Sequence, residues 1–420
     1  CVLARGKVVI AAGAGSGKCV TGDTLVTLPS GTYRIEDLSG SHLLRSVDAE
    51  TLTPSIEIGQ WLDMGTSKVF EVETRSGLRL RGTPEHPLLT WNGSPTWSRL
   101  GTMKPGERLL LQPGAAIGTG SSTVDPEEAY LFGLFMGDGW CSTSTGAMNW
   151  SRSGDDLPPH FYRLGSQFWG ISPVRRQTPG TNSVTHEFYS VKLKAYLADR
   201  GMSFNNARNK FVAPWIFSAS DLERVRFLQG LFDTDGSAYG RTVEWSTASE
   251  RFAREVQQLA LGLGAVGFLR PKKVRGYEDH TYWSLYFTGD QLRNFRERIG
   301  FRYEKKKVSR LDRICEFTCN PNAGTYPHVG PYFHALKEDW KRENRWAGGT
   351  QSLLIGEKWT GVSDYLKGKR DPSRGQILRL IGESNLPEAQ LLRNLTGFYP
   401  DEVVAIRELN GEHRVYDFTV

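Results

Sequence analysis

Apolar and polar residues alternate near both ends of the chain, as they do in half-buried β-strands. The alternation is clear in residues 69–74 and 78–81. It returns in residues 403–406 and 414–420, which flank a turn at Gly411. This pattern predicts paired β-strands in both terminal parts of the chain.

An apolar stretch in the middle of the chain occurs twice. Residues 129–139 recur as residues 225–236, at an offset of 97 positions from Asp138 to Asp235. Each copy predicts a helix with a small residue at its middle, which lets two helix backbones approach closely, and an acid at its carboxyl end. Either copy alone indicates no more than a buried helix with a polar end. Two paired acids repel each other and the helix dipoles, which favours a bound divalent cation, most naturally Mg²⁺.

Composition narrows the class of protein. The chain has 420 residues, 39% hydrophobic and 23% charged, as in globular proteins of two or three domains. It contains no run of about 18 apolar residues and no secretory signal pattern, so we expect neither a membrane span nor export. Five irregularly spaced cysteines favour a reducing, cytoplasmic setting. Cys315 and Cys319 lack the second ligand pair of a zinc site.

The net charge of +6 is unevenly distributed. Basic residues cluster in residues 270–275, 302–313 and 341–345, and aromatic side chains lie close by in the sequence. Such surfaces suit a phosphate backbone. Any one cluster is equally well explained as a solvated face, but three clusters in one half of the chain favour nucleic acid.

A glycine-rich loop follows an apolar strand within residues 7–18, and it resembles the Walker A loop of superfamily 1 DNA helicases. Its candidate phosphate-binding residues are Gly15, Ser16, Gly17 and Lys18. Cys19 stands where a Ser or Thr hydroxyl would bind Mg²⁺, and a thiol is a poor ligand for that hard ion. We therefore expect no ATP hydrolysis by this loop as it stands.

The residues after Lys18 explain this departure. No helix pattern follows the loop; instead residues 19–26 read C-V-T-G-D-T-L-V, which resembles the first block of an intein. Inteins begin with Cys or Ser. An intein inserted after Lys18 would interrupt the helicase loop, and its excision would restore Gly-Lys-Ser/Thr. The resemblance implies that Cys19 is the nucleophile of an N–S acyl shift and that ATP would bind only the spliced host protein.

A second block reads G-T-P-E-H-P in residues 82–87 and resembles the intein T-x-x-H block. Converting the Lys18–Cys19 amide to a thioester requires protonation of the leaving nitrogen. His86 suits that transfer, and Thr83 suits polarisation of the scissile unit. A lone histidine would more simply be a core or surface residue, but the complete block beside Cys19 favours the catalytic role.

The last residues, V-Y-D-F-T-V, resemble a late intein block whose Asp assists the splice-site chemistry, which implies a catalytic role for Asp417. A further strand ending in His-Asn, and then Ser, Thr or Cys, would be expected next. We expect a chain stopping at Val420 to form the thioester without completing splicing by itself.

The repeated apolar stretches resemble the paired LAGLIDADG helices of homing endonucleases, which are often nested in inteins. Strand and helix patterns follow each copy in residues 149–152, 159–169, 185–191 and 193–199, and in residues 242–246, 251–263, 282–287 and 291–299. The resemblance implies two αββαββα halves that hold double-stranded DNA, with Asp138 and Asp235 as catalytic metal ligands for Mg²⁺. Residues 209–214 resemble the family's block with a catalytic-site lysine, which makes Lys210 the candidate, although a plain surface lysine explains it about equally well. Candidates in the second half are Lys272, Lys273 and His280.

Residues 340–391 predict helices, including residues 351–355 and a short helix capped by Ser363 and ended by Gly368. The pattern resembles a helix-turn-helix that would add DNA contacts. A plain helical linker explains it equally well.

The sequence thus predicts a multi-domain chain, with an all-β Hint splicing fold interrupted by an α+β LAGLIDADG endonuclease and a small helical module. The expected domains are residues 1–18 (host helicase stub), 19–122 (Hint, first part), 123–304 (endonuclease), 305–398 (helical module) and 399–420 (Hint, last part). The expected partners of a monomer are the host exteins and the intein-free helicase gene. The alternatives are a P-loop ATPase or helicase fragment, a free endonuclease, and a hedgehog-like domain that cleaves without ligation.

Overall fold

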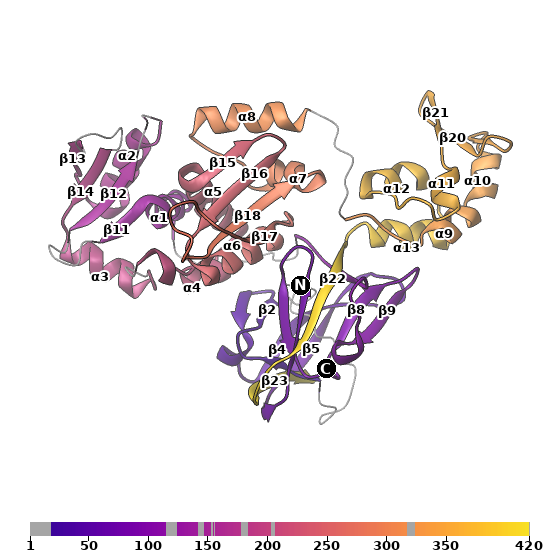
Figure 1. Ribbon diagram of the computed structural model, residues 1–420, viewed down its shortest axis with the longest axis horizontal. Coiled ribbons are helices and arrows are strands. Elements are labelled where there is room, and N and C mark those ends of the chain that lie inside the picture. Colours follow the sequence, from indigo (N-terminus) through magenta and orange to yellow (C-terminus); the bar gives the residue numbers. More distant parts are fainter. Residues whose placement is uncertain are drawn as a thin grey trace. The chain divides into compact units, whose positions relative to one another are not determined.

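The computed structural model describes residues 18–114, 124–141, 147–152, 154, 156–177, 184–202, 206–316 and 324–419. The chain divides into two compact units (Figure 1). The first comprises residues 1–28, 34–113 and 320–420, and the second comprises residues 29–33 and 114–319. Within the described residues, no helix is long and apolar enough to cross a membrane.

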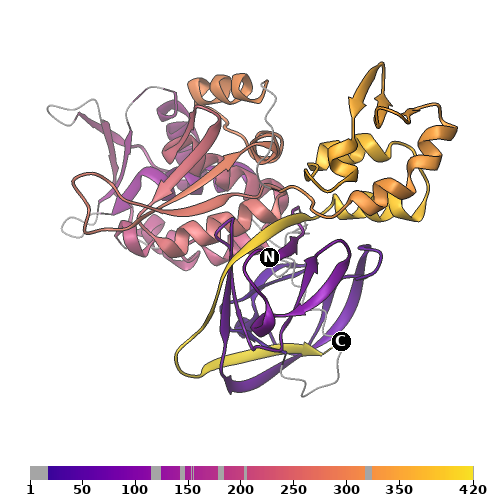
Figure 2. The same ribbon diagram turned by 45° about the vertical axis from the view of Figure 1, so that its right-hand side comes forward.

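Strands from both ends of the chain build one ten-stranded sheet in the first unit. Its order is β4-β5-β23-β1-β7-β6-β22-β10-β8-β9, so the two last strands of the chain lie among strands that precede residue 112 (Figure 2). The strands are β1 (Val20–Thr21), β4 (Ser41–Val47), β5 (Pro54–Ser67), β6 (Phe70–Thr74), β7 (Arg79–Gly82), β8 (Pro87–Trp91), β9 (Pro95–Arg99), β10 (Arg108–Leu111), β22 (Tyr399–Glu408) and β23 (His413–Thr419). Shorter elements are β2 (Leu25–Leu28), β3 (Gly31–Arg34) and the 3₁₀ turns Ile35–Asp37 and Leu100–Thr102.

Residues 324–398 pack onto this sheet as a small α/β module. Its elements are α9 (Gly330–Ala335), α10 (Lys337–Arg342), β19 (Trp346–Ala347), β20 (Ser352–Ile355), β21 (Lys358–Gly361), α11 (Ser363–Leu366), α12 (Arg374–Ile381) and α13 (Pro387–Leu395). Phe333 and Trp340 of the module share a buried cluster with Leu89 and Trp91 of β8. The Trp91 indole also donates a 2.7 Å hydrogen bond to the Pro327 carbonyl. The module therefore shares the core of the β-sheet.

Two local predictions for this module are wrong. Residues 351–355 contain the strand β20 instead of a helix, because Leu353 pairs with Trp346 on one side and Thr360 on the other. The run is too short to hold an isolated helix, and sheet neighbours supply its backbone partners. Ser363 is the first residue of α11 and makes no cap; the capping box of the module belongs to Ser373, which begins α12.

The second unit contains two similar chain segments. The first runs α1 (Pro126–Asp138), β11 (Gly139–Cys141), β12 (Met148–Arg152), α2 (Pro158–Trp169), β13 (Val174–Gln177), β14 (Val184–Phe188) and α3 (Val191–Asp199). The second runs α5 (Asp221–Asp235), β15 (Gly236–Tyr239), β16 (Thr242–Thr247), α6 (Glu250–Gly262), β17 (Phe268–Lys272), β18 (Tyr282–Thr288) and α7 (Asp290–Arg298). The turn Ala207–Asn209 and α4 (Pro214–Ser218) connect them, and α8 (Lys305–Cys315) follows. The two four-stranded sheets have matching orders, β11-β12-β14-β13 and β15-β16-β18-β17.

Helices α1 and α5 lie side by side with their backbones in contact. A Cβ on Gly133 would lie 2.1 Å from the Phe227 carbonyl oxygen, and one on Gly230 would lie 2.4 Å from that of Tyr130. Both positions therefore require glycine, as the small residue in each copy of the repeat predicts. Each helix leads directly into a strand. Strand β11 begins at the residue after α1, and β15 begins at the residue after α5.

Candidate functional site

The peptide bond before Cys19 is held by Thr83. The Cys19 amide, which is the nitrogen of the Lys18–Cys19 bond, donates a 2.9 Å hydrogen bond to Thr83 Oγ1. The Thr83 amide donates back to the Cys19 carbonyl at 2.9 Å, and its hydroxyl lies 3.3 Å from the same oxygen. A Cβ on Gly82 would lie 2.8 Å from that carbonyl, so glycine allows the close approach.

His86 lies in the tight turn that follows Thr83, with its ring wholly buried. Neither ring nitrogen has a hydrogen-bond partner among the described residues. Burial lowers the pKa of His86 to about 4. The Lys18 main chain raises the pKa of His86, although it forms no hydrogen bond of full geometry with the ring. The positive charge of Lys18 lowers this pKa further. His86 is therefore a neutral imidazole beside the Lys18–Cys19 peptide bond. One of its ring nitrogens carries a proton, and the other can accept one.

Asp417 reaches the same place from the other end of the chain. Strand β23 pairs with β1, which places Tyr416 opposite Val20 and Asp417 beside Cys19. Burial raises the pKa of Asp417 to about 7, against the 2.7 Å hydrogen bond from the Phe418 amide. Burial, followed by the charge of Asp417 and then that of Glu85, raises the pKa of the Cys19 thiol to about 12. The thiol is thus protonated at neutral pH, and Asp417 is a nearby acceptor for its proton.

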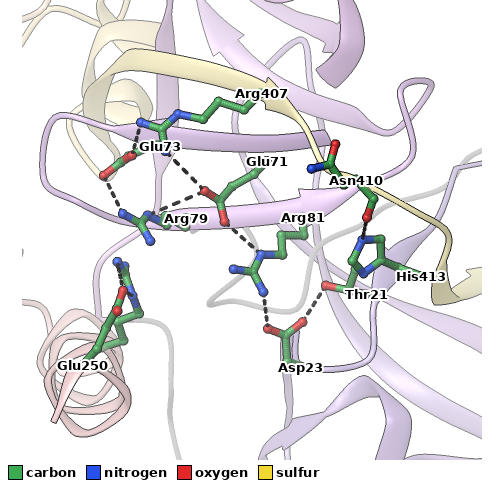
Figure 3. A network of polar contacts seen from close by, with 11 residues as sticks. Thr21, Asp23, Glu71, Glu73, Arg79, Arg81, Glu250, Arg407, Asn410 and His413 are labelled. Atoms are coloured by element: carbon green, nitrogen blue, oxygen red, sulfur yellow. Dashed lines mark hydrogen bonds and ion pairs between the residues drawn. The ribbon is translucent and has the colours of Figure 1, made fainter. Parts of the chain in front are cut away.

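A polar network fixes the turn after Cys19 (Figure 3). Three arginines surround the buried carboxylate of Glu71: Arg79, Arg81 and Arg407. Arg81 also contacts Asp23 at 3.6 Å, and Asp23 accepts a 2.5 Å hydrogen bond from Thr21. These half-exposed pairs add little stability individually, but together they tie the β1 turn to β6, β7 and β22.

The second centre lies at the carboxyl ends of α1 and α5. The Lys210 ammonium donates to the carbonyls of Met136 at 2.6 Å and Gly137 at 2.9 Å, in the last turn of α1. Burial lowers the pKa of Lys210, whereas the charges of Asp235 and Asp138 raise it. Lys210 therefore lies within the electrostatic reach of both carboxylates.

Lys307, in the first turn of α8, occupies the matching position on α5, and the sequence interpretation missed it. Its ammonium donates to the carbonyls of Phe232 at 3.1 Å, Asp233 at 2.6 Å and Thr234 at 2.9 Å. The signal was present in the sequence, because the offset of 97 residues that relates Asp138 to Asp235 also relates Lys210 to Lys307.

The candidates that the sequence suggested for the second half do not form the contacts that Lys307 makes with the carboxyl end of α5. Lys272 forms a 2.7 Å ion pair with Glu244 on the sheet, and Lys273 donates to the Glu278 carbonyl at 3.0 Å. His280 lies in the turn before β18. The lysine that matches Lys210 at the repeat offset comes instead from α8, the helix after the repeat.

The donor set at the two helix ends suits a hard cation. Asp138 and Asp235 supply carboxylate oxygens, the ligand type that Mg²⁺ and similar ions prefer. Within the described ranges, no group of three or more His, Cys, Asp or Glu side chains gathers at one point, so any ion held here would rely on the two acids and on water or phosphate oxygens. Cys319 lies outside the described residues.

Most of the glycine-rich loop also lies outside the described residues, including Gly15, Ser16 and Gly17. Lys18 is described and is half-buried. Strand β1 begins two residues later, at Val20, which confirms that no helix continues from Lys18 as in a nucleotide-binding P-loop.

Residues 223–300 match the family model of the LAGLIDADG-like domain. The chain is 25% identical over 329 residues to the replication factor C small subunit of Thermococcus kodakarensis, covering 73% of this chain and 36% of that protein. It is 26% identical over 437 residues to the replicative DNA helicase DnaB of Rhodothermus marinus, and 27% identical over 432 residues to that of a Nostoc species. Each helicase match covers 96% of this chain, and 44% and 47% of the respective helicase.

The chain thus spans less than half the length of these relatives. Among solved structures, it is similar to the I-DmoI complex with DNA and Ca, with a TM-score of 0.33, 15% identity and coverage of 44% of this chain and 96% of that one. It is also similar to the Ssp DnaB mini-intein variant M86, with a TM-score of 0.21, 24% identity and coverage of 22% and 64%. The LAGLIDADG match and the helicase relatives fit an intein that carries a LAGLIDADG endonuclease within a helicase-like host.

Proposed function

We propose that this chain is a self-splicing intein in which the Cys19 thiol attacks the Lys18 carbonyl carbon. The observation that carries the proposal is the hydrogen bond between Thr83 Oγ1 and the scissile nitrogen, beside a buried imidazole with no hydrogen-bond partner among the described residues. Buried polar side chains without a hydrogen-bond partner are rare in folded proteins, and such an exception often marks a catalytic group.

The acyl shift is balanced within the protein. A bond forms between the Cys19 sulfur and the Lys18 carbonyl carbon, and the bond from that carbon to the Cys19 nitrogen breaks. The thiol proton ends on the Cys19 nitrogen. Asp417 takes the proton from the thiol and passes it to the unprotonated ring nitrogen of His86, which delivers it to the nitrogen that Thr83 orients. Asp417 and His86 thereby return to their starting protonation states. The products are a thioester at Lys18 and a free amine on Cys19.

Cleavage by an added thiol tests this step. Dithiothreitol should release residues 1–18 from the full chain, and Cys19→Ala should abolish the release. His86→Ala should slow it about 100-fold, the usual contribution of one general acid. Cys315→Ala is the matched control, because Cys315 lies on α8 in the other unit. Release that persists in Cys19→Ala excludes Cys19 as the nucleophile.

A second activity is favoured by the paired lysines at the ends of α1 and α5. We propose that this centre cleaves both strands of double-stranded DNA at a site in the intein-free host gene. A divalent ion held by Asp138 and Asp235 would supply an activated water and stabilise the leaving oxygens. Lys210 and Lys307 would each place a charge beside one scissile phosphate, because the α1 and α5 carbonyls hold their ammonium groups in place.

The same proposal assigns the domains. Residues 19–122 and 399–420 would form the Hint fold, and residues 123–304 the two αββαββα endonuclease halves. Helix α8, which follows these halves, would supply Lys307 to the endonuclease centre. The α/β module within residues 305–398 would add DNA contacts through α11 and α12. The host exteins are the other partners, and the active form is a monomer. A plasmid that carries the intein-free gene tests the endonuclease: the chain should linearise it with Mg²⁺, and Asp138→Asn with Asp235→Asn should not, while still binding the site.

A further inference from the structure

Different hydrogen bonds hold the chain segments that carry the two proposed active-site lysines, Lys210 and Lys307. Lys210 is fixed from α6, because Ser249 Oγ donates to the Lys210 carbonyl at 2.6 Å and Glu255 accepts from the Val212 amide at 2.7 Å. Lys307 is fixed from α5 itself, through the carboxylate of Asp233. Both ammonium groups contact carbonyls at the end of a repeat helix, so the difference lies in the side chains that hold each lysine segment.

Asp233 is wholly buried and accepts three hydrogen bonds. Its Oδ2 accepts from the Tyr130 hydroxyl at 2.7 Å and from the Tyr303 amide at 2.9 Å, and its Oδ1 accepts from the Arg302 amide at 2.9 Å. Arg302 and Tyr303 immediately precede α8, which carries Lys307. The carboxylate therefore fixes the point at which the chain enters α8, and with it the reach of the Lys307 ammonium.

The first copy of the repeat cannot build this clamp. At the repeat offset, Met136 occupies the position of Asp233, and Phe227 occupies that of Tyr130. The methionine thioether is only a weak acceptor and cannot replace a carboxylate that binds two main-chain amides, and phenylalanine has no hydroxyl to donate. The clamp is thus present at one of the two lysines.

We propose that Asp233 is a positioning residue for Lys307 alone, so that a change at Asp233 separates the cutting of the two DNA strands. This inference rests on the proposed endonuclease function. A carboxylate suits this position because Tyr130, Arg302 and Tyr303 all donate to it. An amide in its place would turn one acceptor into a donor facing an N–H or O–H group, and the entry to α8 would shift.

Strand-resolved cleavage of end-labelled duplex from the intein-free gene tests the inference. Asp233→Asn should slow one strand at least about tenfold and leave the other within about twofold, so that nicked DNA accumulates. Lys307→Met should slow that same strand. Glu255→Gln and Lys210→Met should slow the opposite strand. A general folding defect would slow both strands equally, and equal slowing in Asp233→Asn would overturn the inference.

Tyr130→Phe is the milder variant, because it removes one donor and leaves the carboxylate. It should give the same strand preference as Asp233→Asn with a smaller ratio. Preference for the opposite strand, or cutting of both strands at the wild-type rate by Asp233→Asn, would contradict the inference.

Amine labelling separates this inference from the endonuclease proposal. Brief treatment of the full chain with an acetylating reagent, read by peptide mass spectrometry, should modify Lys307 faster in Asp233→Asn than in the wild type, with Lys210 unchanged. A folded variant with unaltered Lys307 labelling would overturn the inference even if the wild type cuts DNA. A wild type that cuts no DNA but shows the labelling difference would overturn the endonuclease proposal and retain the clamp.

Discussion

The Cys19 amide donates a 2.9 Å hydrogen bond to the Thr83 hydroxyl, across 64 residues of sequence. This nitrogen is the leaving group of the proposed acyl shift. An amide that donates to a hydroxyl is held in a fixed orientation. The hydroxyl can keep accepting a hydrogen bond from this nitrogen after the nitrogen gains a proton. The bond exists because β1 and β7 are neighbours in the sheet, with Val20 opposite Gly82.

Thr83→Val should slow thiol-induced release of residues 1–18. Valine keeps the shape of threonine and removes the acceptor, so the rate should fall about tenfold or more. Thr83→Ser should restore most of the rate. Equal rates for the valine variant and the wild type would remove Thr83 from the mechanism. The release is followed by intact-mass spectrometry.

The rate of release should rise with pH through about 7. Asp417 accepts the thiol proton only when it is ionised, and burial raises its pKa to about 7. Asp417→Asn should lower the rate and remove this step from the pH profile. Glu85→Gln should keep the step, because Glu85 is exposed and ranks behind Asp417 among the charges acting on Cys19. A wild-type profile without a rise near this pH contradicts the assignment.

Asp417 should also make folding pH-dependent. Its folded pKa, about 7, lies above the value of about 3.9 in an unfolded chain, so the folded state binds this proton more tightly. Its contribution to stability is present below about pH 4 and is lost as the pH rises through about 7. Urea unfolding of the wild type and Asp417→Asn across this range should show a smaller decrease for the variant. A parallel decrease in both proteins would contradict the prediction.

Gly133→Ala should destabilise the second unit by about 3 kcal/mol or more, because the new methyl group collides with the Phe227 carbonyl and the two helices must move apart. Gly375→Ala is the control: it lies within α12, its Cβ would meet nothing within 4 Å, and alanine should add about 0.5–1 kcal/mol. Thermal unfolding checks both, and similar small shifts would contradict the close helix contact.

Lys307→Met should reduce DNA cleavage at least about 100-fold, the usual loss for one electrostatic group in an active site. Lys272→Met should change it much less, because its ammonium pairs with Glu244 on the sheet. Plasmid linearisation with Mg²⁺ measures both variants. A larger loss of DNA cleavage in Lys272→Met than in Lys307→Met would assign the second active-site lysine to Lys272 instead.

The sequence predicted the parts of the molecule that leave a local pattern. The helices that end at Asp138 and Asp235 show apolar repeats, and the blocks around Cys19 and His86 have fixed spacing. Lys307 was missed because its position at the carboxyl end of α5 depends on where α8 docks, which no local pattern encodes; only the repeat offset points to it. Residues 351–355 formed a strand because tertiary pairing of Leu353 outweighed local helix propensity.

The acyl shift at Cys19 is tested most directly by identifying the product formed when the full chain reacts with 2-mercaptoethanesulfonate. We predict one cleavage, with residues 1–18 released as a thioester at the Lys18 carboxyl and Cys19 as the new amino terminus, and no such product from Cys19→Ala. An intact wild-type chain, or cleavage at any other bond, would contradict it.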